Sequence, residues 1–313
     1  MTLLLRRSAV IGSALAVVVT LGAPAAMADD LTDVLNQAHD ATWTATRMTV
    51  SVWGDRTDVI RERVEHAHGS EMIRVDQTWS MVGGGRTMTM GETPDGIAFM
   101  TNNAPVPTGR YELGETTAVR HMYRSCTLVP VMEGDVLRAN LLIDDRTGAT
   151  LITDLYDANG RIYRSVSLSD FIPHRTYEWP GDGTDTPYEI VMHDDDASVP
   201  GEVAGYQLVD EFPGPMNSEQ GFYSDGLFAF SLFVMSPSTF VEGFEDPMTM
   251  ATSEGFYDMV PTAQSIRVHW SDASAHYVLV GDLPPDHLDA VLEALPAPDE
   301  AGVFARLWRR LFG

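Results

Sequence analysis

The sequence contains no lysine, a single cysteine and little positive charge of any kind. All 20 basic residues are arginine, against 45 aspartates and glutamates, so the formal net charge is −25. From Glu178 to Glu300 the only basic residue is Arg267, whereas 24 residues are acidic. Because nucleic acids and anionic lipids both bind to basic surfaces, we expect this acidic half to repel both and the protein to have no nucleic-acid partner. An acidic surface favours a basic partner, but a saline habitat or an arginine-favouring genome explains the same composition.

The lone cysteine excludes an internal disulfide, so the stability of the fold must come from packed cores. We interpret Cys126 as a small buried apolar side chain, with a reactive or intermolecular thiol as the alternative. No cysteine lies near Ala28 to carry a thioether-linked lipid. After the N-terminal segment, no apolar run reaches the roughly 18 residues that a membrane helix needs.

The N-terminus has the pattern of a secretory signal. Arg6 and Arg7 precede an apolar run over residues 9–21, and an A-x-A motif ends at Ala28. The run is shorter than the roughly 20 residues of a membrane-spanning helix, which argues against the alternative of a retained anchor. We therefore expect a signal peptide over residues 1–28 and an extracytoplasmic protein, in a periplasm or at the cell exterior. The two arginines leave the choice between the Sec and Tat export routes open.

Hydrophobic periodicity predicts an α+β protein with two domains. In the first domain, residues 29–178, a helix over residues 31–41 precedes a series of antiparallel strands. We predict strands over residues 48–52, 59–67 and 72–79, turns at residues 54–55 and 83–85, a strand at 97–100, and a short helix over residues 116–124. Three further strands, at residues 137–143, 151–155 and 162–168, are joined by turns rich in aspartate and glycine.

The second half begins with an acidic segment rich in proline and glycine, residues 179–205, which we interpret as a linker. A smaller domain follows over residues 206–298, with strands near residues 206–209, 220–223, 227–235, 266–270 and 277–281. Its closing helix carries an apolar stripe made of Leu288, Val291, Leu292 and Leu295. Residues 299–313 form a basic amphipathic tail that docks either on a membrane surface or on the protein itself.

No combination of residues indicates an enzyme, a cofactor or a metal site. Ser224 has glycine at position 226 but Phe222 where a nucleophile elbow needs glycine, so a Ser-Asp-Gly turn explains the segment better. His66 and His68 are half of a metal site at most, and we expect an exposed polar strand there. Residues 182–185 and 193–196 lack the spacing of a calcium loop and are interpreted as solvated charge.

Two segments of the C-terminal half carry a resemblance to a known family. They are the hairpin sequence from Gly221 to Leu227, followed by an apolar strand, and the segment from Tyr277 to Pro285 before the closing helix. Together they resemble the C-terminal domain of the MucB/RseB family. The three strands at residues 137–168 resemble the same family and the LolA/LolB lipoprotein carriers.

The resemblance implies a half-open antiparallel β-barrel with helices, LolA/LolB-like, and a smaller C-terminal α+β domain. It implies an exported negative regulator of an extracytoplasmic-function sigma factor that binds the outer domain of a membrane anti-sigma factor and senses a lipid-like ligand. The alternative is a lipid or lipoprotein carrier that holds acyl chains. The partner-binding residues that the resemblance implies are Phe222, Tyr223, Ser224, Asp225, Gly226 and Leu227.

Overall fold

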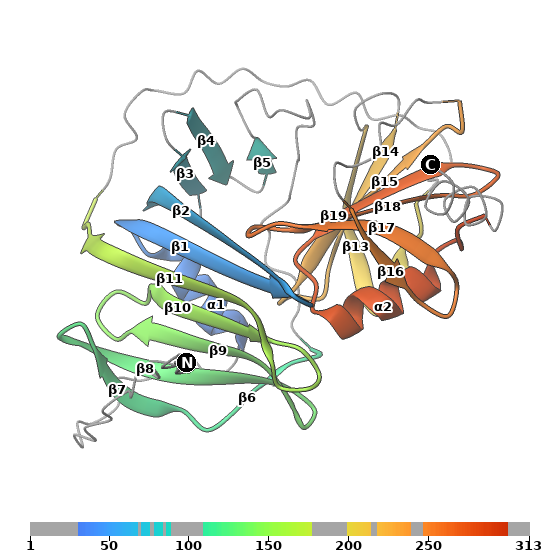
Figure 1. Cartoon of the computed structure of the whole chain (residues 1–313). Helices are drawn as coiled ribbons and strands as arrows, with labels where there is room; N and C mark the ends of the chain where they lie inside the picture. The colour runs from blue at the N-terminus through green and yellow to red at the C-terminus, as the bar shows by residue number, and fades with distance from the viewer. Residues whose placement is uncertain are drawn as a thin grey trace, which may run out of the picture.

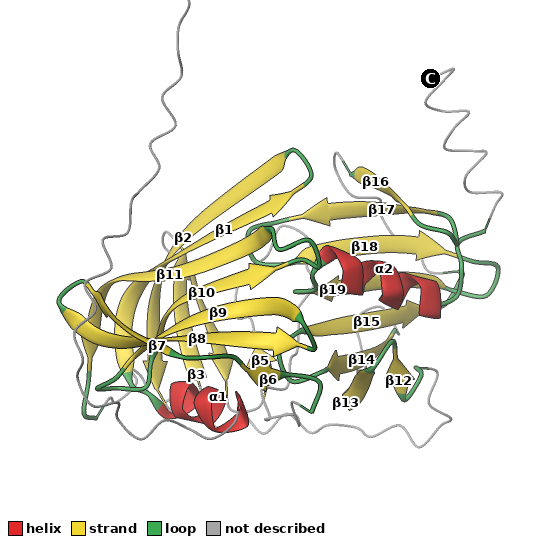
Figure 2. Cartoon of the chain, turned by 90° about the horizontal axis from the view of Figure 1, so that it is seen from below, coloured by secondary structure: helices red, strands yellow, loops and turns green. Residues whose placement is uncertain are grey.

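A computed structural model describes residues 31–67, 70–75, 78–83, 86–88, 109–176, 199–213, 218–238 and 247–299. Several predicted features lie outside these residues: the signal peptide, the turn glycines at 84–85, the strand at 97–100, most of the linker and nearly all of the basic tail. The described residues form two antiparallel sheets, each with one helix (Figures 1 and 2). No described helix has both the length and the apolarity to cross a membrane.

The N-terminal sheet has 11 strands in the order β5-β4-β3-β2-β1-β11-β10-β9-β8-β6, with β7 also paired to β8. Most strands pair with their neighbours along the chain, and β1 pairs both with β2 and with β11, so it joins the two ends of this part of the chain. The sheet is open, as the predicted half-open barrel requires. Its strands are β1 (Trp43–Trp53), β2 (Arg56–Ala67), β3 (Ser70–Val75), β4 (Thr78–Gly83), β5 (Arg86–Met88), β6 (Glu112–Leu113), β7 (Thr117–His121), β8 (Arg124–Glu133), β9 (Val136–Asp144), β10 (Thr150–Tyr156) and β11 (Ile162–Pro173).

Helix α1 (Leu31–Asp40) agrees with the helix predicted over residues 31–41. Its short apolar stripe consists of Leu31 and Val34. Both are buried in a cluster with Val129, Val131 and Leu141 of β8 and β9. Most of the helix surface stays polar, so packing of this stripe rather than intrinsic propensity holds the helix in place.

Two sequence predictions in this domain are wrong. The segment predicted as a helix, residues 116–124, forms β7 and the start of β8, because its backbone pairs with β8 from Thr117↔Leu128 to His121↔Arg124. The strand predicted over residues 72–79 is two strands, β3 and β4, which pair with each other in antiparallel fashion. In both places long-range backbone pairing overrides a local pattern that was ambiguous between element types.

The C-terminal sheet has eight strands in the order β12-β13-β14-β15-β19-β18-β17-β16. The strands predicted near residues 206, 220, 227, 266 and 277 are confirmed, whereas β12, β16 and β17 were not predicted. The strands are β12 (Glu202–Val203), β13 (Tyr206–Pro213), β14 (Glu219–Ser224), β15 (Ala229–Met235), β16 (Met248–Ala251), β17 (Phe256–Pro261), β18 (Ile266–Ser271) and β19 (His276–Gly281).

Helix α2 (Pro285–Ala294) covers one face of this sheet, as predicted. Proline at its first position and Asp286 in its first turn both favour a helix start. The predicted stripe of Leu288, Val291 and Leu292 is fully buried. The same apolar cluster contains α1, β8, β9 and the strands of the C-terminal sheet, so one core runs continuously through both domains.

Cys126 is fully buried on β8, in agreement with its interpretation as a small apolar side chain. Burial is the main reason that the pKa of its thiol rises to about 11. The thiol is therefore protonated at neutral pH and has little nucleophilic character.

A tight backbone approach in the C-terminal sheet yields the first testable prediction. In Gly281→Ala, the new methyl group would lie 2.7 Å from the Ala229 carbonyl oxygen and 2.9 Å from Cα of Phe230. Because both are backbone atoms of β15, we expect overpacking to lower the free energy of unfolding by about 1–3 kcal/mol. Urea unfolding measures the change. Gly109→Ala, whose methyl group meets no atom within 4 Å, is the control, and equal midpoints would contradict the prediction.

Candidate functional site

Residues 222–227 form the end of β14 and the turn into β15. The Ser224 hydroxyl donates to the carbonyl oxygen of Phe228 at 3.2 Å and accepts from the amide of Gly226 at 3.1 Å. Gly226 has a φ of 95°, which glycine tolerates. The Ser-Asp-Gly turn is confirmed, and Ser224 is held by its own hairpin.

Most side chains of this hairpin face the interior. Phe222, Tyr223, Ser224 and Asp225 are buried, whereas Gly226 and Leu227 are partly exposed. Tyr223 stacks on Phe230 at 4.8 Å between ring centroids, and its hydroxyl donates to the carbonyl oxygen of Pro200 at 2.6 Å. These residues therefore build the C-terminal core and present little surface of their own.

Asp225 connects the hairpin to the N-terminal domain. One carboxylate oxygen accepts from the amides of Leu227 and Phe228 at 3.0 and 2.8 Å. The other accepts from the Tyr111 hydroxyl at 2.5 Å and lies 3.6 Å from a guanidinium nitrogen of Arg110. Three hydrogen bonds and the nearby guanidinium together compensate the cost of burying this carboxylate.

His287, in the first turn of α2, lies at the centre of the contact between the two sheets. Its Nδ1 is 2.7 Å from the Tyr206 hydroxyl, and its Nε2 is 3.0 Å from a carboxylate oxygen of Glu133 on β8. The imidazole is 4% exposed, and burial, followed by the charges of Arg110 and Arg138, lowers its pKa. A neutral ring satisfies both contacts, since Nε2–H donates to Glu133 and Nδ1 accepts from Tyr206.

Arg138 of β9 also reaches across the contact. Its Nε donates to Glu133 at 2.6 Å, and its two terminal nitrogens donate to both oxygens of Asp286 at 3.1 and 2.8 Å. Burial alone raises the pKa of Glu133 and of Asp286, but their hydrogen bonds and the positive charges around them together outweigh burial and lower both. Both carboxylates thus remain ionised at neutral pH.

We call this set of residues the joint. Its members come from five separate parts of the chain and hold the N-terminal end of α2 against β8 and β9. The joint consists of Arg110, Tyr111, Glu133 and Arg138 from the N-terminal domain and Tyr206, Asp225, Asp286 and His287 from the C-terminal domain.

A second contact region leaves polar groups without partners. Arg164 of β11 pairs with Asp282 at 2.5 Å, but its Nε and one terminal nitrogen are buried without a hydrogen bond, as is the indole nitrogen of Trp53. A cavity of about 260 Å³ opens beside Trp53, between the β1–β2 hairpin and the turn after β17. We call it the cleft cavity, and it is lined by Ser51, Trp53, Arg56, Thr57, Asp58, Pro261 and Thr262.

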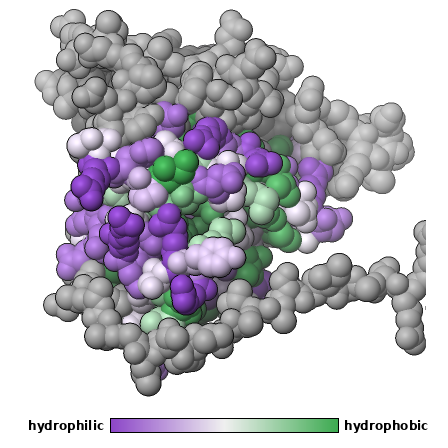
Figure 3. Space-filling view, turned by 90° about the vertical axis from the view of Figure 1, so that its left-hand side faces the viewer, coloured by the Kyte–Doolittle hydropathy of each residue, from purple (hydrophilic) through white to green (hydrophobic). Residues whose placement is uncertain are grey.

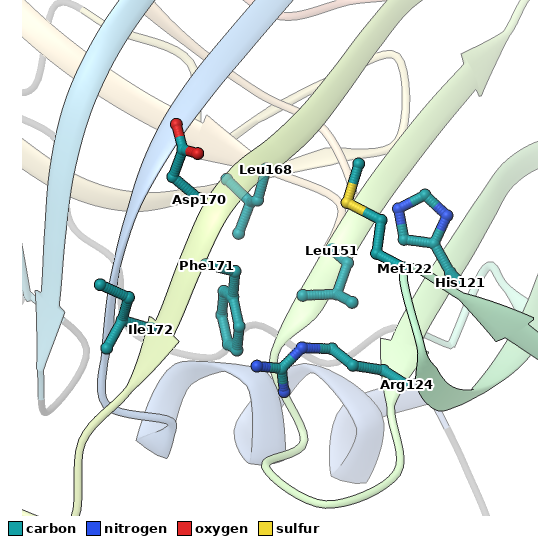
Figure 4. Close-up of a pocket in the computed structure, with 8 residues that line it drawn as sticks. All are labelled: His121, Met122, Arg124, Leu151, Leu168, Asp170, Phe171 and Ile172. Atoms are coloured by element: carbon teal, nitrogen blue, oxygen red, sulfur yellow. The ribbon is translucent and has the colours of Figure 1, made fainter.

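A larger cavity of about 430 Å³, the end cavity, opens at the far end of the N-terminal sheet. Leu151 and Phe171 point into it, and Arg124 crosses from the β7–β8 turn with its guanidinium 4.8 Å from the Phe171 ring centre (Figure 4). On the left-hand side of the molecule, apolar side chains are exposed amid polar ones (Figure 3). The lining residues are His121, Met122, Arg124, Leu151, Leu168, Asp170, Phe171 and Ile172.

The structure corrects the interpretation of His66. We expected an exposed polar strand, but His66 is buried, stacks on Trp43 at 5.0 Å and donates from Nδ1 to the carbonyl oxygen of Ala41. His68 and the acidic segments at residues 182–185 and 193–196 lie outside the described residues. Within the described part of the chain, no three His, Cys, Asp or Glu side chains are grouped closely enough to hold a metal ion.

Two residues of the joint are unusual in their sequence surroundings, but this becomes evident only once the structure is known. His287 lies four residues before Val291 on the apolar stripe of α2, where a titratable residue is unusual. Arg138 interrupts a strand of apolar residues in the same way. Neither residue reveals its partner, because His287 and Glu133 are 154 positions apart.

No protein-family model matches the sequence, and no curated protein matches it either. Solved structures do match. The crystal structure of MucB in complex with MucA(peri) is 15% identical and aligns over 86% of this chain and 100% of the other, with a TM-score of 0.50. The chain has the fold of MucB. At 15% identity this likeness concerns the fold alone.

Two other solved structures are also similar. The MucA/MucB complex of Pseudomonas aeruginosa aligns over 86% of this chain and 99% of that chain at 14% identity, with a TM-score of 0.49. A LolA superfamily protein from Nitrosomonas europaea aligns over 83% and 97% at 9% identity, with a TM-score of 0.23. The MucB fold, with its open N-terminal sheet and smaller C-terminal domain, is the fold that the sequence predicted.

Protonation of His287 should loosen the joint. Because its pKa in the folded protein lies below the ordinary value of 6.5, the unfolded chain takes up the proton first as pH falls. The contribution of His287 to the free energy of unfolding is therefore complete above pH 6.5 and decreases as pH falls below this value. The lowered pKa values of Glu133 and Asp286 extend the loss of stability to more acidic pH. Buried His66, whose pKa is also lowered, contributes in the same direction.

We expect His287→Gln to flatten the dependence of unfolding free energy on pH below 6.5 and to cost about 1–3 kcal/mol at neutral pH, through the contacts it loses. Urea unfolding at a series of pH values measures both effects. His121→Gln, which lies outside the joint, should leave the profile as in the wild type. A His287→Gln profile parallel to the wild type would contradict the assigned role.

Arg138→Met tests the charged part of the joint. The substitution keeps an unbranched apolar stem but removes the guanidinium, so Asp286 loses its arginine and Glu133 keeps only Arg110 of its two. We therefore expect the free energy of unfolding to fall by roughly 2–4 kcal/mol. Urea unfolding gives the magnitude, with Arg161→Met in a neighbouring exposed turn as the control. Equal stability of the two variants would show that the ion pairs contribute nothing.

Proposed function

We propose that this protein is an exported negative regulator of an extracytoplasmic-function sigma factor. In this proposal it acts outside the cytoplasm, by binding the outer domain of a membrane anti-sigma factor and without catalysing a reaction. The observation that carries the proposal is the MucB fold, in a structure whose protein is bound to MucA(peri). The hairpin and helix sequences that resemble the MucB/RseB family support it independently.

The cleft cavity is the place that we propose for the partner. It lies between the two domains, and the indole nitrogen of Trp53 at its wall is buried without a hydrogen bond. Unpaired buried donors are rare, and a peptide carbonyl from a partner would satisfy this one. In the same proposal residues 222–227 act indirectly, because Asp225 and its contact with Tyr111 help to fix the position of the domains on either side of the cleft.

Sensing of a lipid-like ligand forms the second part of the proposal, and the end cavity supports it. Its volume lies within the usual range of small-molecule sites, and its walls are mainly Leu151, Leu168, Phe171 and Ile172. The same cavity favours the alternative function of a lipid or lipoprotein carrier. Membrane contact through residues 299–313 stays a prediction, because the structure describes only Asp299 of that segment.

Partner capture tests the proposal. We expect the mature chain, residues 29–313, to recover a membrane anti-sigma factor from envelope extract, identified by mass spectrometry. Thr57→Trp would fill the cleft cavity and should abolish recovery, whereas Val59→Trp, two residues along the same strand and 55% exposed, should not. Recovery of lipid or lipoproteins alone would favour the carrier. Equal recovery by both variants would leave the partner but remove the cleft cavity as its site.

A further inference from the structure

The turn between β7 and β8 has an unusual conformation. His121 pairs with Arg124, so the loop consists of Met122 and Tyr123 alone. Their φ angles are 46° and 68°, the positive values of a type I′ hairpin turn. Asparagine and glycine are favoured at these two positions, whereas bulky residues there have a strained backbone. Backbone strain of this kind clusters at functional sites.

The same two residues are strongly exposed. Tyr123 is 97% exposed, more than any other exposed large hydrophobic residue that the structure describes, and Met122 is 63% exposed. Neither takes part in a ring contact or side-chain hydrogen bond with the rest of the described chain. In the fold, β7 lies at the end of the N-terminal sheet away from the C-terminal domain (Figure 1). We call Met122 and Tyr123 the tip.

Charged side chains of both signs lie around the tip, and two of them are exposed arginines. Arg120 and Arg146 are exposed, and neither belongs to an ion pair within the described residues. Arg146 and the tip line the same cavity, together with Arg124, Ser125, Asp144 and Asp145. Arg124 lies 3.4 Å from Asp144, so this pair is neutral. Asp145 in the same lining offsets one of the two exposed arginines, so one positive charge remains among these residues.

We infer that the tip is an anchor for an anionic lipid surface. Tyrosine places its ring in the apolar part of the membrane interface and its hydroxyl in water, while methionine buries its side chain. Nearby arginines are attracted to anionic headgroups over about one Debye length, roughly 8 Å at physiological salt. The acidic C-terminal half lies at the opposite end of the molecule, so its repulsion of the lipid is screened (Figure 1).

Anchoring would also orient the molecule. His121, Met122 and Arg124 line the end cavity, so lipid contact at the tip places the mouth of that cavity against the membrane. The inference stands on turn geometry, exposure and charge, and it holds whether or not the protein binds an anti-sigma factor.

A double substitution separates function from folding. M122N/Y123G installs the residues that a type I′ turn prefers, so the unfolding midpoint should stay the same or rise. Binding of the full chain to vesicles of phosphatidylcholine and phosphatidylglycerol in equal amounts, measured by co-sedimentation, should fall about tenfold or more through the lost apolar contact. Val59→Ser, which removes another exposed apolar side chain, should leave binding unchanged.

A fluorescent label locates the contact. Because Cys126 is buried with a raised pKa, Tyr123→Cys offers the only reactive thiol for an environment-sensitive dye. We expect a blue shift with the anionic vesicles, a weaker one with phosphatidylcholine alone, and none for a dye at Val59→Cys. Unchanged binding of M122N/Y123G, or a dye that stays in water, would overturn the inference. The inference would also be overturned if the wild type did not bind vesicles and M122N/Y123G no longer captured a protein that the wild type captures. The tip would then be a protein contact.

Discussion

The carboxylate of Glu133 holds the two domains together. It ends β8, and it receives hydrogen bonds from Arg110, Arg138 and His287, so three donors from different segments share one acceptor group. Each of these donors also contacts the C-terminal domain or belongs to it: Arg138 binds Asp286, and Arg110 lies near Asp225. The Glu133 carboxylate therefore helps to fix the position of α2 and of the sheet face that α2 covers.

Such a joint adds specificity more than stability. Burying ionised groups is costly, and well-packed apolar residues of similar volume are often as stable. The apolar neighbours of the joint are already present, since Phe228 packs edge-on against both Tyr111 and His287. Directional hydrogen bonds reject small shifts between sheets that apolar packing alone would tolerate. We therefore regard the joint as the element that fixes one relative orientation of the two domains.

Local patterns predicted the parts of the fold that local interactions determine. The strands at residues 137–168 alternate clearly and are separated by glycine turns, and the stripe of α2 has clear helical spacing. The strands β16 and β17 were missed because they are short and carry mixed polar and apolar residues, and β7 was mistaken for a helix because its pattern fits both. The joint and both cavities could not be predicted, since each combines residues from distant segments. The hairpin at residues 222–227 was correctly located, but the contact of Asp225 with Tyr111 of the other domain could not be predicted.

The continuous core has a consequence for the life of the protein in its compartment. Because Tyr111 and Tyr163 from the N-terminal domain and Phe228 and Leu283 from the C-terminal domain belong to one buried cluster, neither domain can close its apolar face alone. We therefore expect the two halves to fold cooperatively, as a single unit, despite their separate sheets. Damage to either half would then expose the other to proteases, so quality control acts on the whole molecule at once.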